Sequence, residues 1–125
     1  MGLDRIIRFP AGCVPAWDAI KSHLARVGEP APLRLIDNLP AFPDETPEAG
    51  WRELRITAGG GMITIRQSTD AITCTVWSNA DAALLAARDR VAWACAASGG
   101  GTLVTDTGPA VSHTEFALLS NIHPA

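Results

Sequence analysis

The stretch Trp51–Trp77, WRELRITAGGGMITIRQSTDAITCTVW, contains three runs in which apolar and polar residues alternate. The runs are separated by residues 58–61 (AGGG) and 68–71 (STDA), which are short and rich in turn-forming residues. Alternation with a period of two is typical of a half-buried β-strand, and short turns join antiparallel neighbours. The stretch therefore predicts a meander of three antiparallel strands.

The register of this meander follows from the positions of its two turns. Folding the first hairpin about Gly59-Gly60 and the second about Thr69 places only apolar residues opposite one another on one face. These residues are Leu54, Ile56, Ile63, Ile65, Cys74 and Val76. The same register pairs Glu53 with Arg66 on the other face, a favourable cross-strand contact. A one-residue slip would bring apolar side chains to the polar face, so the pattern favours this register.

The flanking segments complete the element order β-α-β, long loop, β-β-β, α-β-α. We expect strands at 3–9, 33–36 and 102–105, and helices at 15–27, 79–97 and from 113 onward. Ser78-Asn79 offers an N-cap for the second helix, Gly108-Pro109 a turn, and Ser112–Glu115 a capping box for the last helix. This order predicts one α+β domain, 1–125, a two-layer sandwich with the helices on one face of the meander.

Residues 37–50 differ from the rest of the chain because they combine three prolines with four carboxylates. We expect an irregular connection of about fourteen residues, near the upper end of ordinary loop lengths. Phe42 is expected to pin this loop to the body of the domain. If the loop acts as a lid over a ligand, Arg55 and Arg66 together with Asp44 or Glu45 are expected to serve as polar anchors.

Composition argues against several classes of protein. The chain has 125 residues and a formal net charge of −3, and Lys21 is its single lysine. Because the arginines are scattered along the sequence, we expect no binding to nucleic acid. No window approaches the roughly 18 consecutive apolar residues of a membrane helix. We therefore expect a cytoplasmic protein without membrane contact.

The reactive residue types form no recognisable catalytic or metal-binding pattern. Cys74 and Cys95 fall on apolar faces and are expected to be buried, whereas Cys13 lies in a loop. His23, His113 and His123 lie in three separate segments without metal-ligand spacing. Asp106-Thr107-Gly108 matches a tripeptide of aspartic proteases, but too few residues follow it for that fold, and a turn is favoured. We expect no metal, no cofactor and no catalytic residue.

The polar face of the meander is the more informative candidate site. Aromatic residues, methionine and arginine are enriched where proteins meet partners. Several residues of these types are expected on the face of the meander that points away from the helices. The residues of this face are Trp51, Arg55, Met62, Arg66, Thr73, Thr75 and Trp77. Trp93 also falls outside the apolar stripe of its helix and joins this candidate set.

These patterns favour a non-catalytic protein-interaction module that binds a partner, or a second copy of itself, through the exposed face of the 51–77 meander. Size and composition are comparable to those of small secretion chaperones and immunity proteins, which is an analogy at the level of fold. The first alternative is a small-molecule or anion-binding domain, or a small enzyme, with residues 37–50 as its lid. The second is a structural component of a larger assembly.

Overall fold

The computed structural model describes residues 2–105 and 108–124. Its described strands form one antiparallel sheet in the order β3-β2-β4-β5-β6-β1-β7-β8. The strands are β1 (Gly2–Arg8), β2 (Leu33–Ile36), β3 (Leu39–Pro40), β4 (Glu53–Ala58), β5 (Gly61–Gln67), β6 (Ala71–Trp77), β7 (Thr102–Thr105) and β8 (Gly108–Ser112). The helices are α1 (Trp17–Arg26), α2 (Ala82–Gly99) and α3 (His113–Leu119).

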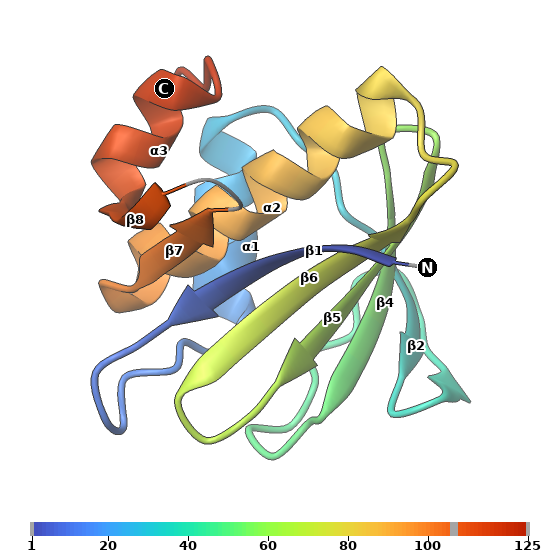
Figure 1. Ribbon diagram of the computed structural model, residues 1–125. Helices are drawn as coiled ribbons and strands as arrows, with labels where there is room; N and C mark the ends of the chain where they lie inside the picture. Colours follow the sequence, from blue (N-terminus) through green and yellow to red (C-terminus); the bar gives the residue numbers. More distant parts are fainter. Residues whose placement is uncertain (1, 106–107, 125) are drawn as a thin grey trace.

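The helices lie on one side of the sheet, which gives the expected two-layer α+β arrangement (Figure 1). α2 runs alongside β1 and β6 and packs against them, α1 lies against α2, and α3 lies near β7 and β8 (Figure 1). The core fills the space between the layers, where Leu54, Ile63 and Val76 are buried as predicted. Among the described residues no helix lies over the opposite side, which we call the uncovered face.

The register of the meander is confirmed. Leu54 lies opposite Ile65, and Ile65 lies opposite Cys74. Glu53 lies opposite Arg66, which in turn lies opposite Thr73. Burial alternates strictly along β4, so that every second side chain enters the core. The hairpin turns and the apolar alternation therefore specify the same register, as expected for a sheet with one buried face.

Two short strands lie outside the predicted set. β3 pairs with β2 across Asp37 and Asn38, whose φ values of 48° and 69° give the left-handed backbone of a tight hairpin turn. β8 pairs with β7, so the expectation of a turn at Gly108-Pro109 is wrong. β8 ends the sheet, and proline is tolerated on an edge strand because no partner there requires its missing N–H.

The second helix begins later than the sequence suggested. Its N-cap is Asp81, whose Oδ1 accepts a hydrogen bond from the Leu84 N–H at 2.9 Å. The expected N-cap at Ser78-Asn79 is therefore wrong, because these residues complete the turn that follows β6. The predicted cap of the last helix is confirmed: Ser112 Oγ accepts from the Glu115 N–H at 3.2 Å.

Candidate functional site

The centre of the uncovered face is built by four neighbouring strands, β4, β5, β6 and β1. Arg55, Thr64 and Thr75 form a row across the first three strands, and Asp4 on β1 lies opposite Thr75. The Thr75 hydroxyl donates a hydrogen bond to Asp4 Oδ1 at 2.8 Å. A row of side chains on adjacent strands projects from a rigid scaffold, which is a suitable base for recognition.

A shallow depression of about 400 Å³ lies over this row. Its lining residues are Asp4, Arg55, Thr64, Arg66, Thr73, Thr75, Val76 and Trp77. Glu53 stands beside both arginines: Arg66 Nε donates to its Oε1 at 2.9 Å, and Arg55 Nε lies 3.5 Å from its Oε2. Arg55 Nε makes no hydrogen bond to the described residues, so its pairing with Glu53 is electrostatic only.

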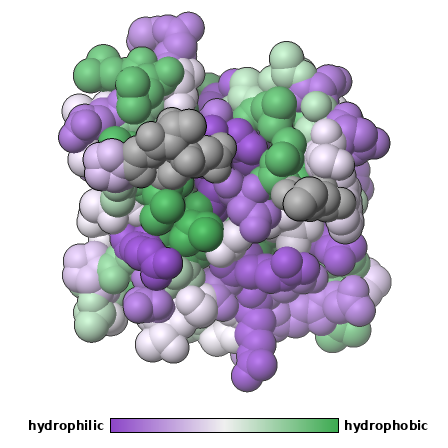
Figure 2. Space-filling view, in the orientation of Figure 1, coloured by the Kyte–Doolittle hydropathy of each residue, from purple (hydrophilic) through white to green (hydrophobic). Residues whose placement is uncertain are grey.

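The uncovered face is more basic than the chain as a whole. Strand alternation places four arginines there among the described residues, against the carboxylates Asp4 and Glu53. The arginines are Arg8, Arg34, Arg55 and Arg66. The complete chain has a net charge of −3. Arginines that are scattered in the sequence are thus gathered by the sheet onto one surface, much of which is hydrophilic (Figure 2).

Two large apolar side chains of the predicted set are exposed at this surface. Trp77 is 67% exposed and Met62 is 43% exposed. Trp77 lines the depression beside Arg55 and Arg66. Tryptophan, methionine and arginine are residue types that are enriched in protein interfaces, and here they are exposed on the same surface.

The two other tryptophans of the predicted set are not exposed. Trp51 and Trp93 are each only 3% exposed and belong to the core. Trp51 precedes β4, so the alternation of that strand does not determine its direction. Trp93 is covered because α1 packs on its side of α2, where the His23 ring meets it edge-on at 5.9 Å. Neither tryptophan can contact a partner while the domain is folded.

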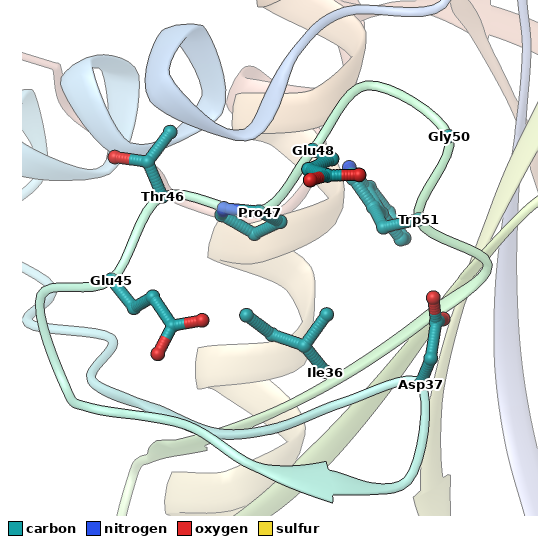
Figure 3. A pocket seen from close by; sticks show the side chains of 8 residues that line it. All are labelled: Ile36, Asp37, Glu45, Thr46, Pro47, Glu48, Gly50 and Trp51. Carbon is teal, nitrogen blue, oxygen red and sulfur yellow. The ribbon is translucent and has the colours of Figure 1, made fainter.

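The 37–50 loop does not form the expected lid. Phe42 is 75% exposed and does not hold the loop against the body of the domain. Pro47 is the buried residue of this loop. The loop borders a hollow of about 380 Å³, in which Glu45 and Asp37 lie on opposite sides of Ile36 (Figure 3). No residue of 37–50 lines the depression that contains Arg55 and Arg66, and exposed Asp44 lines neither space. The proposed meeting of these arginines with Asp44 or Glu45 is therefore wrong.

Asp37 fixes the start of the 37–50 loop rather than a ligand. Its Oδ1 accepts hydrogen bonds from the backbone N–H groups of Arg52 at 2.8 Å and Glu53 at 2.9 Å. These bonds, that from Glu53 first, lower the pKa of the Asp37 carboxyl below its ordinary value of 3.8. The negative charge of Asp37 is thus stabilised by backbone N–H groups of the same chain.

The described residues hold no group of His, Cys, Asp and Glu side chains arranged for a metal ion. Cys13 is exposed, whereas Cys74 and Cys95 are buried, as predicted. Hydrogen bonding to the Cys74 thiol, together with burial, raises the pKa of Cys95 well above its ordinary range, so Cys95 stays a neutral thiol. Asp106 and Thr107 lie outside the described residues.

One groove of the structure could not be predicted from the sequence. His23, His113 and His123 line a common groove between the three helices. Nothing in their spacing could reveal this, because each belongs to a different segment and tertiary packing alone brings the segments together.

Comparisons of the chain with protein families, curated proteins and solved structures found no match. In the part of the chain that the structure describes, none of the helices combines the length and apolar character needed to cross a membrane.

Proposed function

We propose that this chain is a non-catalytic protein-interaction module whose uncovered face binds a partner protein rich in carboxylates. The observation that carries the proposal is the exposure of Trp77 beside an excess of arginine, on a chain that is acidic overall. Trp77, Met62, Arg55, Arg66 and Thr75 are the contact residues in this proposal.

The chemistry of the face suits an acidic segment. A guanidinium group can donate two parallel hydrogen bonds to one carboxylate, which combines charge with a defined geometry. Arg55 and Arg66 line one depression, so they can bind neighbouring carboxylates of the same segment. Trp77 adds a large rigid surface that can be covered at a small cost in side-chain entropy.

Charge disfavours a symmetric pair of these faces. A two-fold contact places the same patch on both subunits, so two surfaces that each carry an excess of arginine would face each other. Like charges brought together in this way cost binding free energy. A different protein with an acidic surface avoids this cost, and we therefore favour a heterologous partner over self-association.

A small anion is the second candidate ligand, because the depression of about 400 Å³ has the volume of a small-molecule site. Its shallow form on a sheet surface favours an extended segment, which can also cover Met62. A role as a component of a larger assembly would use the same surface. We place the chain in the cytoplasm in this proposal because Cys13, Cys74 and Cys95 are free thiols.

Site-specific photo-crosslinking tests the proposal in the organism that encodes the chain. Benzoylphenylalanine replaces Trp77, which keeps an aromatic side chain at the face, and in a control variant it replaces exposed Asp18 on α1. We expect a discrete adduct with another protein from position 77 and none from position 18. Adducts that are identical at the two positions, or no adduct at position 77, would overturn the proposal.

The captured protein is then purified and its affinity for the chain is measured directly. We expect Arg55→Glu and Arg66→Glu to weaken binding by at least about tenfold each, because each variant places a like charge against the partner. Lys21→Glu, which changes the charge equally on α1, is the matched control and should have little effect. A crosslinked adduct of twice the mass of the chain would show that the partner is a second copy of the chain and not a different protein.

A further inference from the structure

The depression on the uncovered face has two ends of opposite charge. The strands β4, β5, β6 and β1 lie side by side in that order, and one row of residues crosses them (Figure 1). The row consists of Arg55, Thr64, Thr75 and Asp4. Neighbouring strands are about 4.8 Å apart, so the three strand intervals separate the backbones of Arg55 and Asp4 by about 14 Å. A guanidinium group and a carboxylate therefore mark the two ends of this row.

The acidic end of the depression is suited to a cation. The Thr75 hydroxyl donates a hydrogen bond to Asp4 Oδ1 at 2.8 Å, which orients the carboxylate without neutralising its charge. Asp4 is exposed, and no ion pair links it to another described residue. Trp77 lines the same depression and follows Thr75 by two positions, so it lies on the same face of β6. An exposed indole beside a carboxylate can bind an ammonium or guanidinium group.

The basic end of the depression carries one positive charge in excess. Arg55 and Arg66 both line it, and both lie against the single carboxylate of Glu53. Arg55 Nε lies 3.5 Å from Glu53 Oε2 and makes no hydrogen bond to a described residue. A carboxylate from another molecule would supply both the missing charge and the missing acceptor.

The separation of the two ends determines the kind of ligand that can reach both. A free amino acid carries its ammonium and carboxylate groups on one carbon atom, so it cannot span the row from Arg55 to Asp4. An extended chain advances about 3.3 Å per residue, so side chains four positions apart are separated by about 13 Å and point to the same side. This separation matches the length of the row. Side chains three positions apart point to opposite sides of an extended chain and cannot both face the sheet.

We infer that the partner binds through an extended segment in which a lysine or arginine lies four positions from an aspartate or glutamate. The cation lies between Asp4 and Trp77, and the carboxylate lies at Arg55 and Arg66. This inference rests on the proposed function, which requires only an acidic partner, and it adds one basic residue and its spacing. Asp4 is then a specificity-determining residue, because it repels a segment that carries a carboxylate at the position of the cation.

Fluorescence anisotropy with labelled synthetic peptides at low salt tests the inference. The first peptide is rich in serine and threonine, has blocked ends, and carries one lysine and one glutamate four positions apart. The second has the same composition with the two charges three positions apart, and the third has norleucine in place of lysine. We expect the first peptide to bind most tightly and the other two to be weaker by about fivefold, because each loses the contact with Asp4 and Trp77. Net charge alone predicts the opposite order for the norleucine peptide, which is more acidic.

Variants at Asp4 identify the residue that reads the cation. Asp4→Asn keeps an acceptor for the Thr75 hydroxyl but should remove the preference for lysine over norleucine. Asp18→Asn on α1 removes the same charge and should retain this preference. Asp4→Lys should reverse the specificity, so that a peptide with glutamate at both positions binds more tightly than the lysine peptide.

Poly-L-glutamate separates this inference from the proposed function on which it rests. If polyglutamate binds and Arg55→Gln weakens it, but the peptides show no preference for lysine or for its spacing, the inference is overturned and the proposed function stands. A preference for lysine that persists in Asp4→Asn would also overturn the inference. If neither polyglutamate nor any peptide responds to Arg55→Gln, the proposed function is overturned as well.

Discussion

Glu53 on β4 accepts a hydrogen bond from Arg66 on β5, with 2.9 Å between Oε1 and Nε. The same carboxylate also lies 3.5 Å from Arg55 Nε. One acidic side chain thus partly neutralises both arginines of the proposed contact surface. A carboxylate of a partner has to compete with Glu53 for these guanidinium groups.

Removing this internal carboxylate should strengthen the binding of acidic ligands. We expect Glu53→Gln to raise the affinity of the chain for poly-L-glutamate by several-fold, because Arg55 and Arg66 lose their local counter-charge. Stability should change by less than about 1 kcal/mol, as is usual for exposed ion pairs. Fluorescence anisotropy with labelled polyglutamate at low salt measures the affinity.

Asp18→Asn removes the same charge from α1 and serves as the control for Glu53→Gln. If both variants raise the affinity equally, net charge alone is responsible and the local argument is wrong. Because Arg66 is largely exposed, the difference should also shrink as salt screens the charges.

The tryptophans should separate into two classes by their effect on stability. Trp51→Ala removes a buried indole and should lower the free energy of unfolding by about 3–5 kcal/mol. Trp77→Ala removes an exposed one and should cost less than about 1 kcal/mol. Urea unfolding followed by far-ultraviolet circular dichroism measures both without relying on tryptophan fluorescence. A loss for Trp77→Ala as large as that for Trp51→Ala would show that Trp77 supports the fold rather than a partner.

The features that could be predicted from sequence are those that local patterns specify. The register from Leu54 to Cys74 depends on alternation and on two short turns, and both signals lie within the segment. The hairpin that creates β3 had a local signal as well, since Asp37-Asn38 suits the left-handed backbone of such a turn. The density of proline around it instead favoured an irregular loop.

The remaining features depend on contacts between distant segments. Trp93 lies outside the stripe expected of a helix with one buried face, but α2 is also packed against α1 and α3, so several of its faces are buried. The excess of arginine on the uncovered face and the histidines of the groove likewise arise only when separate segments meet. No periodicity within one segment reports such proximity.

The tip of the first hairpin packs closely against α2. Gly59 has a φ of +59°, and a Cβ at this position would lie 2.7 Å from the Ala83 carbonyl oxygen and 2.7 Å from Ala87 Cβ. We expect Gly59→Ala to lower the free energy of unfolding by about 1–3 kcal/mol, because backbone strain and overpacking act together.

Gly60→Ala is the matched control for this contact. Gly60 shares the left-handed backbone, with a φ of +80°, but a Cβ there meets no atom within 4 Å. The decrease in the free energy of unfolding for Gly60→Ala should therefore reflect backbone strain alone and be smaller than that for Gly59→Ala. Chemical unfolding measures both. Equal decreases in the free energy of unfolding for the two variants would show that overpacking against α2 does not contribute to the effect of Gly59→Ala.

The carboxylate of Asp37 should make the stability of the domain depend on pH. The hydrogen bonds from the Glu53 and Arg52 N–H groups lower its pKa below the ordinary value of 3.8, so folding favours the charged form. The resulting stabilisation is fully present above about pH 4, where Asp37 is charged in the unfolded chain too, and is lost as the pH falls through the lowered pKa of the folded state.

Asp37→Asn isolates this contribution because asparagine keeps an acceptor oxygen and tolerates the positive φ of this position. At pH 7 the variant should unfold at a lower urea concentration than the wild-type chain. The gap should close as the pH is lowered below 3.8, because the protonated aspartate then resembles asparagine. Asp44→Asn, in the same loop, controls for the loss of one negative charge. A gap that persists at low pH would show that the charge of Asp37 does not support the turn.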